Sequence, residues 1–121
     1  MWVYQQSTGE IKQEDTELLA CGYSGKGECK NDPSSQKRHN EGPIPCGTYQ
    51  IQAPYDTKTH GPFVLPLAPN LDNQMFGRSG FLIHGDSLHD PGTASEGCII
   101  LNRAVRERIW ESGDHDLKVI V

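Results

Sequence analysis

Glycine and proline cut this chain into short segments, and this division limits the secondary structures it can form. The sequence has 13 Gly and 8 Pro among its 121 residues, and most of its apolar runs are only a few residues long. Globular helices need uninterrupted segments of roughly 8 to 20 residues. The one stretch with helical periodicity is 102–112, with Asn102 placed to cap its start and Gly113 to end it. We therefore predict a mostly β fold with one helix near the C-terminus.

The apolar residues of this helix are expected to define the face that packs on the core. Ala104, Val105, Ile109 and Trp110 share one side of the predicted helix. The charged residues of the segment fall largely outside that side: Arg103, Arg106, Glu107 and Arg108.

Short segments rich in apolar residues indicate the strands. Residues 2–6 and 9–13 predict a hairpin, and prolines beside residues 63–67 favour an edge position or a bend. Residues 22–45 are dense in Gly, Ser, Asn, Asp and Pro and predict a long surface loop. Other expected strands are 18–23, 47–52, 81–84, 98–101 and 117–121. With no repeat or linker visible, residues 1–121 are predicted to form one domain.

Charge and hydropathy exclude several classes of protein. The net charge is −5 and no segment is rich in Lys and Arg, so we expect no nucleic-acid partner. No stretch approaches the roughly 18 apolar residues of a membrane span, so the chain is not expected to be membrane-embedded. The N-terminal stretch MWVYQQSTGEIKQ lacks the features of a Sec signal peptide. We expect the chain to be made in the cytoplasm and to leave it by another route.

The four cysteines do not all have the same expected role. Cys21, Cys29 and Cys46 lie in the first half of the chain, where two of them pair or none do, and Cys98 stands apart as a free thiol. There is no CxxC motif to support a zinc ribbon.

The stretch FLIHGDSLHDPGTASEGCIIL, residues 81–101, gathers most of the reactive side chains. His84 ends one apolar run and Cys98 begins the next. If the two runs are neighbouring strands, His84 comes close enough to act as a base for a Cys98 nucleophile. Gly85 and Gly97 would leave room for a substrate backbone. Backbone N–H groups around Gly97 and Cys98 could stabilise an oxyanion.

The same residues allow other interpretations. His84 could cap a strand while Cys98 fills the core, or His84, Asp86 and His89, with Asp90 and Cys98, could bind zinc. Asp86, Ser95 or a backbone carbonyl could orient the His84 imidazole. Arg78 could pair with a substrate carboxylate, and Tyr23 and Ser24 could line the cleft. Three further histidines are expected to be solvated at the surface: His39, His60 and His115.

The motifs resemble a known enzyme family. FLIHGD followed by ASEGCIIL is similar to the signature of YkuD-type L,D-transpeptidases, and GPIPCGTYQI resembles the upstream strand motif of that family. Together with GYSGKGECKNDPSSQ, they most resemble the small L,D-transpeptidase-related effectors of bacterial type VI secretion systems. The resemblance covers roughly residues 20–102.

This resemblance implies a compact β-sandwich or β-barrel and a cofactor-independent cysteine enzyme. It implies that Cys98 is the nucleophile, that His84 is its base, and that the Gly85 carbonyl orients the imidazole. Asp86 is expected to tune the site, and Ser95 and Gly97 to shape it. The implied reaction is attack on meso-diaminopimelate in peptidoglycan tetrapeptide stems. D-alanine leaves, and the acyl group on the cysteine is then transferred to water or to an amine.

Two positions depart from the pattern of the larger family. Glu96 and Ile100 stand where that family often has a histidine and an arginine. The usual anchor for the substrate carboxylate therefore has no counterpart, and Arg78 is the candidate to replace it. The departure favours trimming or exchange of stems over cross-linking.

The effector resemblance also implies a biological setting. The protein would be a monomeric antibacterial toxin that a type VI system delivers to the target-cell periplasm. Its partners would be a carrier in the secretion apparatus and a periplasmic immunity protein. The remaining alternatives are a metal-dependent cell-wall peptidase using the His84, Asp86 and His89 segment, a papain-like peptidase using His115, and a non-enzymatic cell-wall-binding β-domain.

Overall fold

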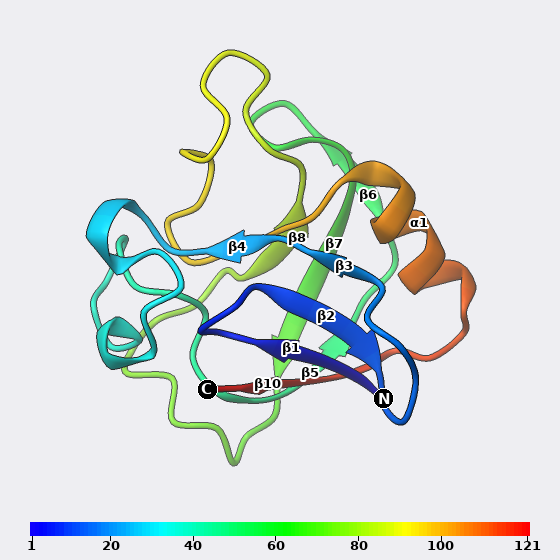
Figure 1. The fold of residues 1–121 in the computed structure, drawn as a ribbon, viewed down its shortest axis with the longest axis horizontal. Helices are drawn as coiled ribbons and strands as arrows, with labels where there is room; N and C mark the ends of the chain where they lie inside the picture. Colours follow the sequence, from blue (N-terminus) through cyan, green and yellow to red (C-terminus); the bar gives the residue numbers. More distant parts are fainter.

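A computed structural model describes residues 1–121, and it has the predicted mostly β architecture with one helix near the C-terminus (Figure 1). Two 3₁₀ helices, Gly27–Cys29 and Pro33–Ser35, lie in the first half. The helix is α1 (Arg103–Glu111). The strands are β1 (Trp2–Gln5), β2 (Glu10–Gln13), β3 (Ala20–Cys21), β4 (Tyr23–Ser24), β5 (Gly47–Ile51), β6 (Tyr55–Thr57), β7 (Gly61–Pro69), β8 (Leu82–His84), β9 (Ile99–Ile100) and β10 (Asp116–Ile120).

The sheet is nearly closed into a barrel. Its strands follow the order β3-β2-β1-β10-β5-β7-β8-β9-β4, with β6 paired to β7 outside this path. The two end strands, β3 and β4, are separated in the sequence only by Gly22. The Gly22 N–H donates to the Gly9 carbonyl at 2.7 Å, and a Cβ on Gly22 would lie 1.8 Å from the Ile100 carbonyl oxygen. Only a residue without a side chain fits at this closure.

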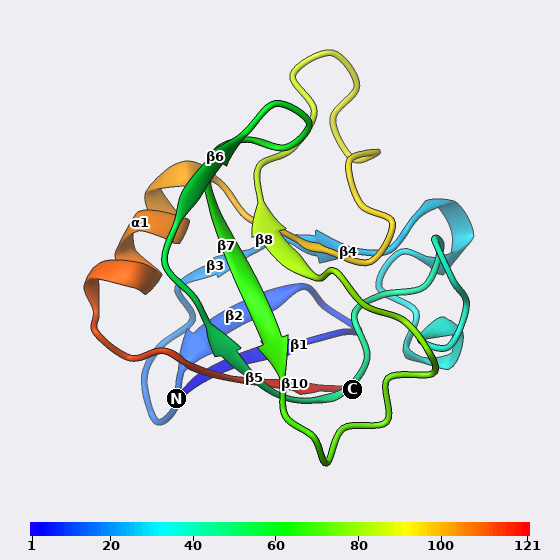
Figure 2. The ribbon, with the colours of Figure 1, turned by 180° about the vertical axis from the view of Figure 1, so that it is seen from behind.

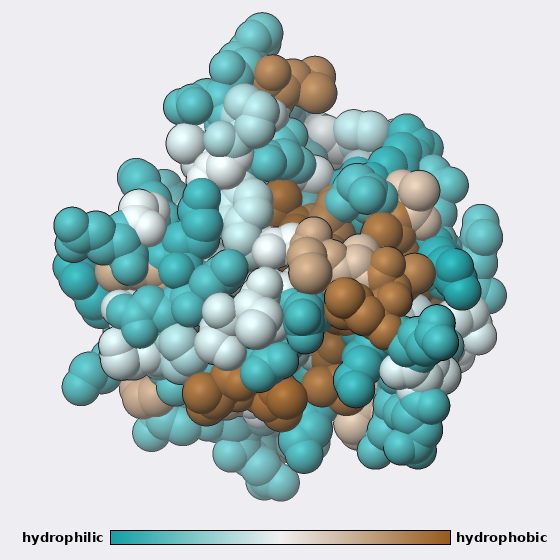
Figure 3. Space-filling model, viewed as in Figure 1, coloured by the Kyte–Doolittle hydropathy of each residue, from teal (hydrophilic) through white to brown (hydrophobic).

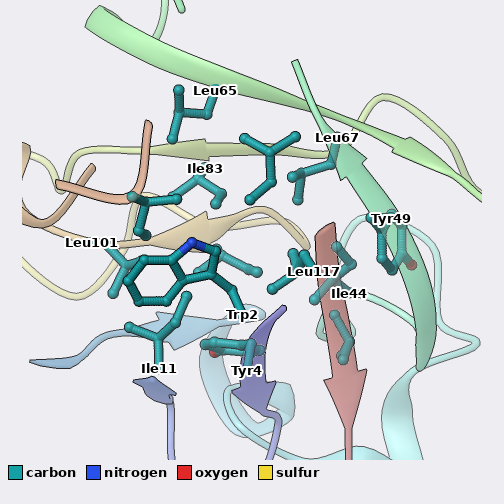
Figure 4. Close-up of a cluster of buried hydrophobic side chains, with 14 of the residues drawn as sticks. Trp2, Tyr4, Ile11, Ile44, Tyr49, Leu65, Leu67, Ile83, Leu101 and Leu117 are labelled. Carbon is teal, nitrogen blue, oxygen red and sulfur yellow. The ribbon is translucent and has the colours of Figure 1, made fainter. Parts of the chain in front are cut away.

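The hydrophobic core fills the barrel interior (Figure 4). Every second side chain along a strand points into this core, as do Trp2 and Tyr4 of β1 and Leu117 and Val119 of β10. The predicted hairpin of β1 and β2 is confirmed, and β10 runs parallel to β1. The face drawn in Figure 3 is mostly hydrophilic, with hydrophobic patches near its centre. No helix of the structure has the length and apolar character that crossing a membrane requires.

Two details of the predicted helix differ. Asn102 caps it as expected, because its side-chain oxygen accepts a hydrogen bond from the Val105 N–H. Ala104 is exposed, however, and Arg106 is buried with only 3% of its surface exposed. Arg106 was predicted to lie outside the apolar face of the helix, but it is buried because its guanidinium binds backbone carbonyls beneath the helix.

Of the edge position or bend predicted for residues 63–67, the edge position is wrong. They belong to β7, which pairs with β5 and β6 on one side and β8 on the other. The Pro66 carbonyl accepts a hydrogen bond from the Gln52 N–H. In a strand, the nitrogen and the carbonyl of one residue point toward the same neighbour, so the Pro66 nitrogen also faces the β5–β6 side, at the point where β7 changes partner from β5 to β6. No ladder donor is needed there, which is how a central strand tolerates this proline.

The segment 22–45 is less loop-like than expected. It includes β4 and both 3₁₀ helices, and residues 42–45 are buried, with Ile44 fully enclosed. The four cysteines are all free thiols in the structure.

Candidate active site

An open cleft of about 1620 Å³ lies at one end of the barrel. Figure 2 shows the β6–β7 loop and the segment that links β8 to β9 rising at this end. Residues from both loops line the cleft, together with residues at the start of α1. His84 and Cys98 both line it as well.

The pairing of β8 with β9 places His84 and Cys98 on one face of the sheet. The strands are parallel, with Ile83 opposite Ile99 and His84 opposite Ile100. Side chains alternate between the faces of a sheet, so the two partners Ile83 and Ile99 enter the core. His84 and Cys98 occupy diagonal positions on the cleft side, with Cα atoms roughly 8 Å apart from standard strand geometry. The predicted neighbouring strands are confirmed.

His84 is held as a neutral base. Only 2% of its surface is exposed, and its Nδ1 lies 2.8 Å from the Gly85 carbonyl oxygen. A carbonyl only accepts hydrogen bonds, so Nδ1 carries the proton and Nε2 keeps its lone pair. Burial lowers the pKa of His84 and outweighs the hydrogen bond to Gly85, which raises it, while the charges of His60 and Arg106 lower the pKa further. The Gly85 carbonyl therefore makes the contact that the resemblance implies.

His60 covers His84. Its ring lies in the β6–β7 loop with its centroid 4.4 Å from that of His84, at an interplanar angle of 33°. His60 is exposed, as expected, and its ring also packs against the His84 imidazole. No local sequence pattern indicates this contact, because 23 residues separate the two histidines and the contact depends on how the fold places the β6–β7 loop beside β8.

Cys98 is a protonated thiol in its resting environment. Burial is the main cause that raises the pKa of Cys98 to about 11. Glu96 raises this pKa further, while the Leu82 backbone and the Arg78 charge oppose the rise. The sulfur lies 4.0 Å from the Gly80 carbonyl oxygen. The raised pKa of Cys98 and the lowered pKa of His84 both disfavour a preformed ion pair between them, and a protonated thiol would need a base before it could attack a substrate.

We expect the alkylation of Cys98 by iodoacetamide to be slow near neutral pH. Its rate should rise about tenfold per pH unit up to about pH 10, because the thiolate fraction grows in that proportion below the pKa. Mass spectrometry of the peptide that contains Cys98 measures this rate, and Cys98→Ser provides the blank. A rate that levels off below about pH 7 would show a thiolate–imidazolium pair instead.

Gly85 and Gly97 each make room for a buried arginine. A Cβ on Gly85 would lie 2.9 Å from Arg106 Nη1, and one on Gly97 would lie 2.5 Å from Arg78 Nη2. Gly97 also has φ +143°, a conformation that disfavours side chains. The prediction that these glycines leave space for a substrate backbone is therefore wrong, because guanidinium groups fill that space.

Arg78 has no free Nη hydrogen for its predicted role as carboxylate anchor. Its Nη1 donates to the carbonyls of Gln36 and Pro43, and its Nη2 donates to those of Gly42 and Glu96. All four Nη hydrogens are therefore committed to the backbone. Arg78 fastens the turn before Cys98 and leaves a positive charge beside the thiol.

Ser24 and Ser95 lie behind the cleft surface. Both are fully buried, so the prediction that they bind substrate directly is wrong. The Ser95 hydroxyl donates to the Cys98 carbonyl and accepts from the Gly97 N–H, while the Ser24 hydroxyl donates to the Gly97 carbonyl. These contacts fix the turn that carries the thiol. They also occupy the Gly97 N–H, which removes it as an oxyanion donor.

Tyr23 and Asp86 form a pair at the cleft rim. The Tyr23 hydroxyl donates to Asp86 at 2.6 Å, and Asp86 also accepts from the N–H groups of Ser87 and Gly92. Burial and this hydrogen bond raise the pKa of Tyr23 to about 12. Asp86 therefore organises the loop after His84, whereas the backbone orients the imidazole.

The residues proposed for a metal site do not converge. His84 points Nδ1 at the backbone, Asp86 is occupied by the loop, and no group of three or more His, Cys, Asp or Glu side chains gathers anywhere in the structure. His115, the base in the papain-like alternative, stacks on Trp110 with centroids 4.1 Å apart and does not line the cleft. Neither alternative has geometric support.

A barrel with a buried histidine and a free cysteine on one cleft face defines a candidate cysteine enzyme. Residues 19–121 match the model of the Tlde1 domain, and the chain belongs to this family of type VI secretion effectors, which is related to the L,D-transpeptidases. No match to the chain was found among curated proteins or among solved structures.

Proposed function

We propose that this protein is a peptidoglycan-targeting cysteine enzyme and an antibacterial toxin. It cleaves the bond between meso-diaminopimelate and D-alanine in tetrapeptide stems, as an L,D-carboxypeptidase, or exchanges the terminal D-amino acid. The observation that carries this proposal is that Nε2 of His84 is left as a free base on the same cleft face as the Cys98 thiol. Membership of the Tlde1 family supports the toxin assignment.

The first half of the reaction transfers the acyl group to the cysteine. His84 Nε2 takes the thiol proton as Cys98 Sγ attacks the carbonyl carbon of meso-diaminopimelate. The carbon–nitrogen bond then breaks, and the imidazolium returns the proton to the departing D-alanine amine. A thioester on Cys98 remains.

The second half releases the stem. His84 deprotonates water, which attacks the thioester and yields a tripeptide stem and the free thiol. An incoming D-amino acid amine reacts in the same way and yields an exchanged tetrapeptide. The Cys98 N–H makes no hydrogen bond within the protein and can donate to the oxyanion. The nearby Arg78 charge favours the same negative state.

A purified tetrapeptide stem tests the proposal in vitro. Liquid chromatography with mass spectrometry should detect the tripeptide and free D-alanine, in excess chelator as well as without it. Adding an excess of D-methionine separates exchange from hydrolysis, because exchange produces a D-methionine stem. An unchanged tetrapeptide in the presence of folded protein would defeat the proposal, and chelator sensitivity would favour the metal alternative.

The lowered pKa of His84 predicts an acid-tolerant activity. The base must be neutral to act, and a pKa below the usual 6.5 keeps it neutral at more acidic pH. We expect kcat/KM to hold through about pH 6.5 and to fall only below it. His84→Gln should lower kcat by about 10²- to 10⁴-fold. An acid limb centred above pH 6.5 would contradict this assignment.

Delivery and partners follow from the family as part of the same proposal. A type VI system would carry the protein to the target-cell periplasm, and a carrier in the apparatus would bind it. The producing cell would protect itself with a periplasmic immunity protein. Directing the protein to the periplasm with an added leader, with and without the candidate immunity protein, tests this directly.

A further inference from the structure

Two buried arginines flank the cleft without any carboxylate partner. Arg78 and Arg106 have 7% and 3% of their surfaces exposed, and both line the cleft. Each binds only backbone carbonyls, and neither takes part in a salt bridge. Buried charges are normally paired, so the cleft holds two positive charges that an anionic ligand could balance.

The two guanidinium groups differ in the donors they leave free. Arg106 donates from Nε to the Phe63 carbonyl, from Nη1 to that of Leu101 and from Nη2 to that of Pro62. A guanidinium has five N–H groups, so one hydrogen on each Nη of Arg106 has no protein acceptor. Arg78 has no free Nη hydrogen.

The charged groups around Arg106 do not neutralise it. Glu107 is the adjacent acid, but its carboxylate is bound to Arg103 Nε at 2.7 Å. His84 and His60 face the cleft on the other side, and neither supplies a negative charge. Two free Nη hydrogens on one guanidinium suit a carboxylate, which arginine binds in a bidentate manner.

Arg106 also stands on the side where the leaving group must be. Its Nη1 packs against Gly85, the residue after the base His84, whereas Arg78 packs against Gly97, before the nucleophile. The amine expelled in the proposed reaction must reach His84 to collect a proton. In a C-terminal residue, that amine and the α-carboxylate share one carbon atom. The carboxylate therefore approaches the cleft wall that Arg106 forms.

We propose that Arg106 binds the C-terminal carboxylate of the stem peptide and thereby restricts the enzyme to terminal residues. This inference rests on the proposed function. Arg106 replaces Arg78 as the anchor for the substrate carboxylate, and it binds substrate without taking part in proton transfer.

The test compares a tetrapeptide stem with the same peptide as its C-terminal amide. Wild-type protein should cleave the free acid roughly 10- to 100-fold faster, the range that a charge-assisted hydrogen-bonded contact provides. Arg106→Gln should lose most of this preference, mainly through cleavage of the acid, and Arg106→Lys should keep part of it. Arg108→Gln, an exposed position on the same helix that does not line the cleft, should leave both rates unchanged.

The possible outcomes separate the two proposals. Equal cleavage of acid and amide by the wild type overturns the assignment of Arg106 and leaves the proposed function standing. This comparison needs no variant, so it holds even if Arg106→Gln fails to fold. A folded Arg106→Gln protein that keeps the full preference also overturns the assignment. Cleavage of neither peptide overturns the proposed function and this inference with it.

Discussion

Replacing Cys98 with alanine is expected to abolish the release of D-alanine from tetrapeptide stems and to remove toxicity in the periplasm. The loss should be on the order of 10⁴-fold or more, as when other enzymes lose a covalent nucleophile. The reason is that the proposed acyl intermediate forms on the Cys98 thiol, which alanine lacks. Product formation by mass spectrometry and growth of cells with periplasmic protein are the two measurements.

The fold should survive this change, which makes the result interpretable. Alanine removes one sulfur atom at a half-buried position. The Ser95 hydroxyl bonds to the backbone carbonyl of residue 98, which alanine keeps. Cys46→Ala is the matched control, because Cys46 is a half-buried thiol that does not line the cleft. It should keep full activity. Toxicity that persists in folded Cys98→Ala would favour the non-enzymatic wall-binding alternative.

Gly22→Ala is expected to lower the free energy of unfolding by about 3 to 5 kcal/mol, or to prevent folding. Its Cβ would lie 1.8 Å from the Ile100 carbonyl oxygen and 2.8 Å from a Leu101 side-chain carbon. These atoms belong to the backbone and core where the barrel closes, so relief would require β3 and β4 to separate from their partners. Urea denaturation followed by far-UV circular dichroism measures the change.

Gly27→Ala separates this steric effect from ordinary glycine strain. Gly27 has φ +57° and open space around its Cα, so alanine there should cost only about 1 to 2 kcal/mol. At Gly22 the reverse holds: a Cβ would clash with neighbouring atoms, but the backbone is not in the left-handed region. Equal losses for the two variants would show that the closure is looser than the structure implies.

The parts of the fold that local chemistry determines could be predicted from the sequence. The Asn102 cap, the helix end at Gly113 and the β1–β2 hairpin depend on neighbouring residues, and the structure confirms them. The central place of β7 and the closure at Gly22 depend on strands distant in the sequence. The prolines of β7 indicated an edge strand. Nothing in the local sequence reveals that the Pro66 nitrogen lies where β7 changes its partner strand and needs no hydrogen bond.

Some residues of the candidate site could be predicted from the local sequence, and others depend on the fold. His84 and Cys98 could be identified because each sits at the end of an apolar run beside a glycine. The roles of Arg78, Arg106 and His60 could not, since they depend on which backbone atoms the fold brings together. The glycines after His84 and before Cys98 predicted room for a group beside the backbone, but the sequence does not reveal that arginines rather than a substrate fill it.

The most direct test of the whole account is the stem composition of cell walls from bacteria that receive the protein in the periplasm. Mass spectrometry of digested peptidoglycan should show tetrapeptide stems replaced by tripeptides, or by stems with an exchanged terminal residue. Cells with Cys98→Ala should retain their tetrapeptides. Killing by the wild-type protein with unchanged stems, or identical stem changes with Cys98→Ala, would contradict the account.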